Sequence, residues 1–272
     1  LYYPKVESIK EQENVFTAFS YWLRKRIFSL SYSILPANEA SLLIGILLGI
    51  KTSFSEDFIS NLRVAGLTHV IAASGMNITL IASFLLSNLI HLVSRKRAIL
   101  ITLFFISLYT FIAGFQPSIV RAAIMGSIAF SAQYLGRQYI SEYILLLTAL
   151  IMLIIDPLLF SNIGFQLSFL ATAGILFIKP LFSTRYSLVD DLVTTAIAQL
   201  MTVPIILFYF GEYGLFSLLA NALVLWTIPI LMALGGMGTM FGLIIPWIGK
   251  FIFIICLPFL WYFRFITDIV AS

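Results

Sequence analysis

The sequence predicts an all-α membrane protein, a polytopic transmembrane bundle of about seven or eight spanning helices with additional interfacial and re-entrant helices. Hydrophobic residues make up 61% of the 272 positions, charged residues make up only 10%, and the mean hydropathy is +1.04. These values lie far outside the range of soluble domains. The apolar residues also form runs that approach the ~20 residues a helix needs to cross a ~30 Å hydrocarbon core.

The remaining composition restricts the chemistry that the chain can support. Its single cysteine, Cys256, excludes an intrachain disulfide and a metal site built on several cysteines. The formal charge of +4 and the pI near 9.2 favour anionic neighbours, either lipid headgroups or nucleic acid. Because the chain opens on Leu1 and not on methionine, we expect it to be an excerpt of a longer protein.

Residues 1–67 are predicted to form an N-terminal segment of amphipathic, interfacial and re-entrant helices. Apolar residues recur every three or four positions over residues 15–35, which is typical of a helix that lies in the membrane interface. Pro36 ends this pattern. The apolar run that follows, residues 40–50, is too short to span the bilayer, as expected of a re-entrant helix.

A second amphipathic helix is expected over residues 53–67, where Ser53 is the predicted N-cap and Glu56 completes a capping box. The rest of the chain, residues 68–272, is predicted to be the transmembrane bundle, so that the two segments form one membrane domain. The expected spanning helices cover residues 77–93, 98–113, 117–135, 142–155, 163–178, 192–210, 215–234 and 251–269.

Charges between the expected spans predict an orientation. Cations gather after the first, third and fifth spans, at Arg95, Lys96, Arg97, Arg137, Lys179 and Arg185. The intervening loops instead carry the acidic residues Asp156 and Glu212. By the positive-inside rule the cationic loops are cytoplasmic, which places the segments around Arg24 and His69 at the outer face.

A polar break over residues 65–77 is the first candidate site, because freed backbone groups need protein or a water-filled cavity at membrane depth. It contains His69, Ser74 and Asn77. Asn77 shares a helix face with Asn88 and His91, so it either lines a pore or bonds to neighbouring helices. A second stripe of small residues, Thr79, Ser83 and Ser87, is expected to pack closely against another helix.

Arg121 is the second candidate, in the segment that begins Gln116-Pro117 and has proline at the first helical position. A cation near a helix N-terminus opposes the macrodipole and needs a compensating partner. Two explanations are open. Arg121 pairs with Asp156 or Glu212, which the predicted topology puts on the same side, or it meets an anionic substrate.

Intramembrane amides and helix breakers form the third group: Gln166, Gln199 with Pro204, and Asn221 with Pro229. These residues serve either helix contacts or a hydrophilic path, and the sequence does not choose between them. Four glycines then follow within eight residues, at Gly235, Gly236, Gly238 and Gly242, where we expect a second re-entrant element.

No enzymatic activity is expected, and no residue is nominated as catalytic. A serine protease would need a histidine near Ser74, but the chain has only His69 and His91, with no group placed to orient either. The sequence also shows no glycine-rich phosphate loop with a lysine and no zinc-ligand spacing. No cofactor and no metal are therefore expected.

Five stretches carry a family resemblance: residues 36–49, 65–77 with Ala-Gly-Leu-Thr-His and Ala-Ser-Gly, 117–125 with Pro-Ser-Ile-Val-Arg-Ala, 156–170 with Gly-Phe-Gln-Leu-Ser-Phe-Leu, and 199–221. Taken together, they make the chain resemble the competence domain of the ComEC family. The resemblance implies a channel in the bacterial cytoplasmic membrane that passes one DNA strand inward while the other is degraded. It also implies other competence proteins as partners, namely a DNA receptor and a cytoplasmic translocation ATPase, besides the lipid bilayer.

Our functional prediction is therefore a channel for single-stranded DNA in natural transformation. The predicted path residues are His69, Ser74, Asn77, Gln116, Arg121, Gln166, Gln199 and Asn221, and the residues predicted to attract DNA at the outer face are Arg24, Lys25 and Arg26. Two other classes are consistent with the same features. A small-solute secondary transporter would use the same broken helices and amides, and a structural scaffold would have no conduit.

Overall fold

The computed structural model describes residues 15–50, 54–67, 75–182, 187–210 and 217–271, and every element within these ranges is helical. The α-helices are α1 (Val15–Ile34), α2 (Ala37–Leu48), α3 (Glu56–Val64), α5 (Gly75–Leu89), α6 (Arg95–Ile112), α7 (Pro117–Tyr134), α8 (Ser141–Ile155), α9 (Ile163–Ala173), α10 (Ser187–Phe210), α11 (Ser217–Val224), α12 (Thr227–Ile244) and α13 (Pro246–Ala271). A 3₁₀ helix (Pro157–Ser161) precedes α9, and a π-helical turn (Gly174–Ile178) and a second 3₁₀ helix (Lys179–Phe182) follow it. The predicted all-α fold class is confirmed.

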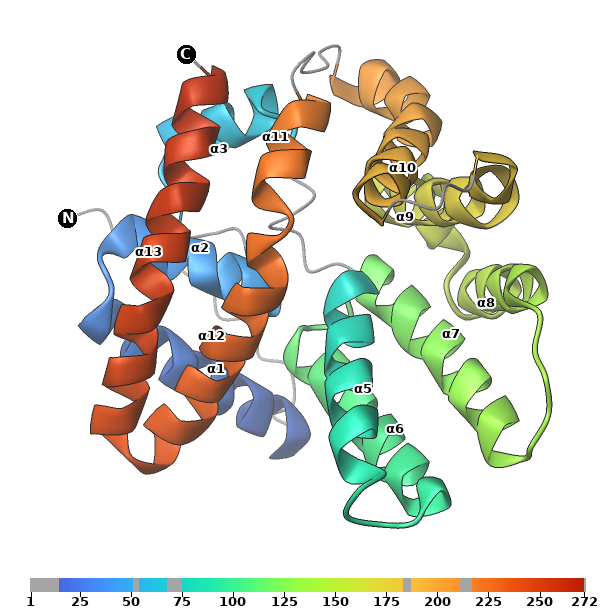
Figure 1. The fold of residues 1–272 in the computed structure, drawn as a ribbon, viewed down its shortest axis with the longest axis horizontal. Helices are drawn as coiled ribbons and strands as arrows, with labels where there is room; N and C mark the ends of the chain where they lie inside the picture. The colour runs from blue at the N-terminus through green and yellow to red at the C-terminus, as the bar shows by residue number, and fades with distance from the viewer. Residues whose placement is uncertain (1–14, 51–53, 68–74, 183–186, 211–216, 272) are drawn as a thin grey trace.

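The two ends of the chain build one part of the molecule together. Helices α1, α2 and α3 pack with α11, α12 and α13 around a shared apolar core, although some 200 residues separate them in sequence (Figure 1). Helices α5, α6 and α7 form a second cluster beside it, and α8, α9 and α10 extend from α7. The middle of the chain is thus attached to a core made by its ends.

Helix α2 is short and enclosed by protein. Its 12 residues rise only about 18 Å, well below the thickness of a bilayer core. Pro36 precedes it, and Gly49 ends it in the left-handed conformation (φ 72°). Every residue from Glu39 to Leu48 is buried, and α1, α12 and α13 are its main neighbours. The structure thus has a short, buried helix where the re-entrant helix is predicted.

The start of α3 differs from the expectation. Ser55 is the N-cap, and its side chain accepts a hydrogen bond from the Phe58 amide at 3.4 Å. The predicted capping box between Ser53 and Glu56 is wrong, because Glu56 is the first residue of the helix and Ser53 lies outside the described residues. Ser55 is followed three residues on by Phe58 and not by an acidic or amide residue, so the capping-box pattern selects Ser53 and misses Ser55.

The glycine cluster near the C-terminus also corrects the prediction. The expected span over residues 215–234 is not one helix. A turn at residues 225–226 separates α11 from α12. Helix α12 then continues through all four glycines without a re-entrant break. The physical reason is packing: a Cβ on Gly249 of α13 would overlap the Cα of Gly242. Gly242 and Gly249 let the two antiparallel helices approach at backbone distance.

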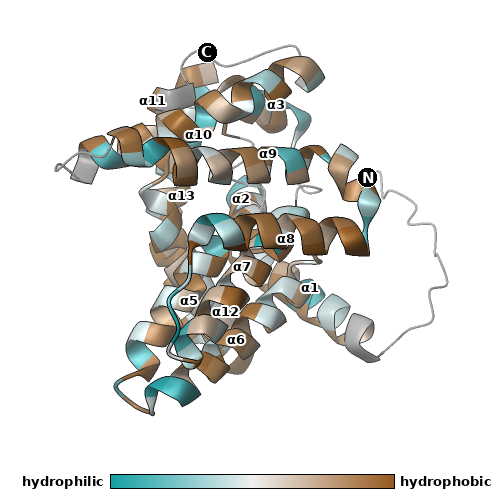
Figure 2. Cartoon of the chain, turned by 90° about the vertical axis from the view of Figure 1, so that its right-hand side faces the viewer, coloured by the Kyte–Doolittle hydropathy of each residue, from teal (hydrophilic) through white to brown (hydrophobic). Residues whose placement is uncertain are grey.

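Four of the described helical segments are long and apolar enough to cross a membrane: Ile163–Phe182, Leu192–Tyr209, Thr227–Ile244 and Pro246–Ala271. Helices α2, α5 and α8 are apolar but shorter. Figure 2 shows α8 as mostly hydrophobic along its length, and its side chains Ile154 and Ile155 are largely exposed. Such surfaces suit lipid contact, so the structure is a membrane-type bundle.

Candidate functional site

Arg121 lies in the second turn of α7 and is only 8% exposed. Its guanidinium reaches across to α9. Nε donates to Ser168 Oγ at 2.7 Å, and Nη1 donates to Thr172 Oγ1 at 2.5 Å. The guanidinium carbon also lies 5.9 Å from the centre of the Phe169 ring. Ser168 and Thr172 are four residues apart on α9, so one helix face presents both hydroxyls to the arginine.

No carboxylate neutralises Arg121 within the described residues, where the ion pairs join Lys179 to Asp190 and Arg264 to both Glu39 and Asp268. The expected pair with Asp156 is not found. That carboxylate instead accepts the Leu158 amide at 3.0 Å and caps a 3₁₀ helix. The other expected partner, Glu212, lies outside the described residues. Arg121 is therefore a buried cation held by hydroxyls and a ring face.

The N-terminus of α5 approaches the same guanidinium. A Cβ built on Gly75 would stand 2.8 Å from Arg121 Nη2 and 3.2 Å from the Ala122 Cβ. A larger residue where α5 begins would therefore require the Arg121 side chain or Ala122 to shift. The structure thus brings the first residue of α5, within the predicted polar break, next to the start of α7, although the sequence presented the two segments as separate candidates.

Asn77, two residues further along α5, stabilises the end of α2. Its side-chain amide donates to the Ile46 carbonyl at 2.8 Å and to the Tyr109 hydroxyl at 2.9 Å. Tyr109 then donates its own proton to the Leu47 carbonyl, also at 2.8 Å. Two of the carbonyls that an ending helix leaves unsatisfied thus receive side-chain donors from α5 and α6.

Gln116 completes this arrangement from the turn before α7. Its amide nitrogen donates to the Gly49 carbonyl at 2.9 Å, just beyond α2. Two predicted path residues, Asn77 and Gln116, therefore hold the C-terminal end of α2. Of the two explanations offered for Asn77, the contact to neighbouring helices fits its geometry. Tyr109 was missed from the sequence, because nothing distinguishes it from the chain's other 11 tyrosines.

The three remaining amides have different surroundings. Gln166 donates to the Phe160 carbonyl at 2.8 Å and stabilises the chain before its own helix. Gln199 is half-buried in α10. Asn221 is fully buried in α11, and neither polar atom of its side chain has a hydrogen-bond partner among the described residues. A buried unpaired amide is unfavourable in a membrane protein, which marks Asn221 as unusual.

Two more predicted path residues, His69 and Ser74, lie outside the described residues. The predicted outer-face cations separate into two kinds. Arg24 donates from Nε to the Ile112 carbonyl at 2.6 Å, at the C-terminus of α6, and its partial burial lowers its pKa. Lys25 and Arg26 are exposed. Only these last two present their charge freely to solvent.

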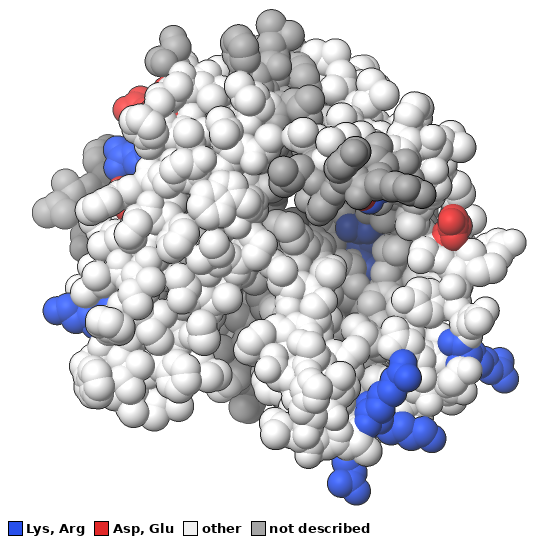
Figure 3. Space-filling model, viewed as in Figure 1, with Lys and Arg blue, Asp and Glu red and all other residues white. Residues whose placement is uncertain are grey.

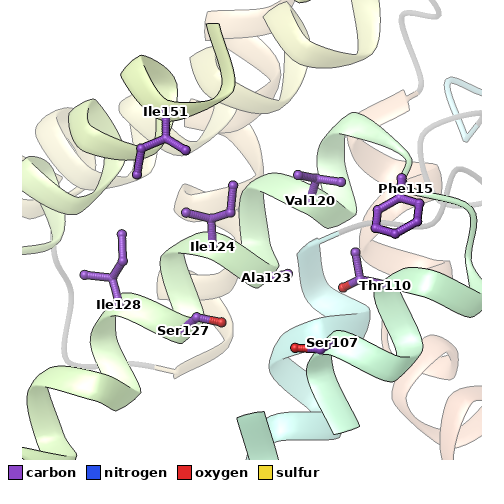
Figure 4. A pocket seen from close by; sticks show the side chains of 9 residues that line it. All are labelled: Ser107, Thr110, Phe115, Val120, Ala123, Ile124, Ser127, Ile128 and Ile151. Carbon is purple, nitrogen blue, oxygen red and sulfur yellow. The ribbon is translucent and has the colours of Figure 1, made fainter. Parts of the chain in front are cut away.

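An open groove of about 350 Å³ runs between α6, α7 and α8. Its lining is mostly apolar, with hydroxyls on one side (Figure 4); it comprises Ser107, Thr110, Phe115, Val120, Ala123, Ile124, Ser127, Ile128 and Ile151. None of the predicted site residues belongs to it. The chemistry of this groove suits lipid chains better than a phosphate.

A buried carboxylate was not nominated from the sequence. Glu39, in the first turn of α2, is 4% exposed and pairs with Arg264 Nη1 of α13 at 3.1 Å. Arg264 also faces Asp268 at 3.7 Å, and Asp268 accepts a hydrogen bond from Asn61 of α3 at 3.0 Å. These four side chains connect α2, α13 and α3. The described residues contain no group of three His, Cys, Asp or Glu side chains that could hold a metal.

Comparison with known proteins places these features in a family. The sequence pattern of the family described as "Competence protein" matches residues 46–272. The chain belongs to this family. ComE operon protein 3 of Bacillus subtilis (strain 168) is 26% identical over 204 residues, which cover 74% of this chain and 26% of the relative. No solved structure matches. The resemblance to the ComEC competence domain is confirmed, and the chain spans about a quarter of that relative's length.

Proposed function

We propose that this chain is part of the membrane path that admits single-stranded DNA during natural transformation, in the bacterial cytoplasmic membrane. Membership of the competence family and the membrane-type bundle support this role. The proposed partners are single-stranded DNA, a DNA receptor, a cytoplasmic translocation ATPase and the lipid bilayer. The chain contributes positioning and a charged path rather than chemistry, so degradation of the second strand belongs to other sequence or to a partner.

The observation that carries the proposal is the unneutralised charge of Arg121. Phosphates are costly in hydrocarbon, so a strand needs cations that attract it without trapping it. A guanidinium paired with a carboxylate would be neutral overall. The contacts of Arg121 are instead two hydroxyls, the Met125 sulfur and an aromatic face, none of which cancels its positive charge. Figure 3 shows a hollow near the middle of one face, with cationic atoms inside it.

The exposed cations Lys25 and Arg26 add a second step to the proposal. By the predicted topology they lie at the outer face, near the end of α6 that Arg24 contacts. Exposed cations attract nucleic acid mainly through counterion release, so capture at this surface should weaken steeply with salt. In this proposal Arg24 maintains the local structure, while its two neighbours collect the strand.

The experiment is uptake of end-labelled DNA in competent cells that lack their own channel protein. The full-length parent of this chain is supplied with Arg121 intact, as Arg121→Lys or as Arg121→Gln, and Arg97→Gln serves as the control for charge loss outside the path. We expect strand-selective uptake with the intact parent and with Arg97→Gln. Uptake should fall partly with Arg121→Lys, and at least about tenfold with Arg121→Gln, because lysine retains the charge and glutamine does not.

Other results separate the rival functions. If all four proteins insert normally and Arg121→Gln admits DNA as well as the intact parent, the charge of Arg121 is not part of the path. If the intact parent admits no DNA but accumulates a small solute under an ion gradient, the secondary transporter replaces the DNA path. Insertion without any transport would support a scaffold.

A further inference from the structure

A groove at the turn between α5 and α6 has a chemistry that the proposed DNA path does not use. It has a volume of about 420 Å³ and is lined by Ser83, Leu86, Ser87, Ile90 and Arg95. Ser83, Leu86 and Ser87 lie along one face of α5, Ile90 follows the end of that helix, and Arg95 is the first residue of α6. Figure 1 shows the two helices side by side, joined by a tight turn at the lower edge of the view.

The α5 face of this groove has no helix packed on it. Thr79, Ser83 and Ser87, which were expected to contact another helix, are all exposed. Ile90 is exposed as well. Within the described chain, the predicted packing of this stripe is therefore wrong, and the small serine side chains leave open the space that a neighbouring helix would have filled. A face of this kind in a membrane protein meets either lipid or another chain.

The open end of the groove is strongly cationic. Arg95, Lys96, Arg97 and Arg137 are all exposed, and Figure 3 shows cationic atoms gathered at the lower right of the molecule. Lys96 lies over the Tyr134 ring at 5.4 Å, while Arg95 borders the groove. No ion pair involves Arg95 within the described residues, and the groove lining contains no carboxylate.

The N-terminus of α6 adds to the positive potential at this end of the groove. Three cations occupy the first turn of α6, where no acidic residue balances them, and Ser94 at the N-cap makes no side-chain hydrogen bond to the helix. Cations are unfavourable at this end of a helix dipole, whereas an anion is favourable. An external negative charge beside Arg95 would relieve that conflict.

We propose that this groove binds an anionic phospholipid of the cytoplasmic leaflet. The phosphate pairs with Arg95, and the upper part of one acyl chain lies along Leu86 and Ile90. The positive-inside rule places the turn at the cytoplasmic face, which is where anionic headgroups and basic juxtamembrane residues meet. Charge complementarity selects an anionic lipid over a zwitterionic one. It also disfavours a second copy of the chain, which would bring two Arg95 side chains together.

The test measures the lipid retained by the full-length protein after purification from nanodiscs that contain equal phosphatidylglycerol and phosphatidylcholine. The variants are Arg95→Gln, which removes the cation, and Ser87→Leu, which keeps the cation but fills the groove. Arg137→Gln is the matched control, because it removes the same charge at the same face outside the lining. We expect the retained ratio of phosphatidylglycerol to phosphatidylcholine to fall about fivefold in both groove variants and to stay unchanged in the control.

Equal losses in Arg95→Gln and Arg137→Gln would overturn the proposal, because diffuse surface charge would then explain the preference. Efficient disulfide crosslinking of two chains through Ser87→Cys would overturn it too, in favour of a second copy. Neither result depends on DNA uptake, so the lipid site and the DNA path can fail separately. If Arg95→Gln does not fold, Ser87→Leu decides the matter alone.

Discussion

The side-chain amide of Asn77 donates to the backbone carbonyl of Ile46 at 2.8 Å, across 31 positions of sequence. This bond fixes the start of α5 against the end of α2, while Arg121 approaches the same end of α5 from α7. A helix that ends inside the bundle is therefore stabilised next to the buried cation. The capped end of α2 and the Arg121 guanidinium thus both lie against the first turn of α5.

We expect Asn77→Leu to destabilise the protein by about 1–3 kcal/mol, because the Ile46 carbonyl would lose its donor while staying buried. The thermal unfolding midpoint in detergent should fall by roughly 2–10 °C. Asn88→Leu is the matched control, since among the described residues Asn88 bonds only to the Phe84 carbonyl of its own helix, and its side chain is exposed. Equal midpoints for the two variants would show that the contact to α2 contributes nothing to stability.

The neighbouring cations Arg24 and Lys25 should differ in effect. Arg24→Gln removes the donor to the Ile112 carbonyl and should lower stability by about 1 kcal/mol. Lys25→Gln should leave stability unchanged, because that side chain is exposed. In the proposed function, Lys25→Gln should instead weaken DNA capture and reduce its dependence on salt.

Unfolding midpoints and DNA binding measured over a range of salt concentrations test both halves of this expectation. A loss of stability in Lys25→Gln that matches the loss in Arg24→Gln would contradict the division between a structural and a capturing cation. Unchanged DNA binding in Lys25→Gln would leave the structural half intact and remove the capturing role.

The Glu39–Arg264 pair predicts a non-additive result. Arg264→Met should destabilise the protein by up to about 3 kcal/mol, because it leaves the buried Glu39 carboxylate unpaired. The loss of stability should be smaller than for a fully buried ion pair, because the Arg264 side chain is itself 41% exposed. Adding Glu39→Gln removes the buried charge and should restore much of the loss. Unfolding midpoints of the two single variants and the double variant measure this coupling.

The elements that sequence reasoning located well are those with local signals. The helix expected over residues 117–135 is α7 (Pro117–Tyr134), because proline at the first position fixes where a helix begins. Residues 142–155 similarly agree with α8 (Ser141–Ile155). In each case an apolar run ends at polar residues, and hydropathy alone finds the boundary.

Most of the features that the sequence did not predict depend on contacts between residues far apart in the chain. The break between α11 and α12 falls at Leu225 and Trp226, and Pro229 in the first turn of α12 is a local signal that the single predicted span did not use. The donors to α2 are Asn77, Tyr109 and Gln116, and their role depends on carbonyls 31 to 67 positions away. Hydropathy and periodicity describe one helix at a time and cannot show which helix end a polar side chain reaches.

Two glycines provide the sharpest test of helix packing, because they belong to the same pair of helices and differ in their surroundings. A Cβ on Gly249 would overlap Gly242 and approach within 2.9 Å of the Gly238 carbonyl oxygen, whereas a Cβ on Gly236 would meet nothing within 4 Å. Gly249→Ala should therefore separate α12 from α13 and destabilise the protein by roughly 1–3 kcal/mol, the usual range for overpacking.

Gly236→Ala should instead be neutral or stabilise α12 by up to about 1 kcal/mol, since alanine favours helix more than glycine does. Unfolding midpoints of the two variants, measured in the same detergent, give the comparison directly. A lower midpoint for Gly249→Ala together with a higher midpoint for Gly236→Ala would establish close packing as the reason for glycine at residue 249. A stable Gly249→Ala would mean that the two helices lie further apart than backbone contact requires, and that the glycines of α12 have another purpose.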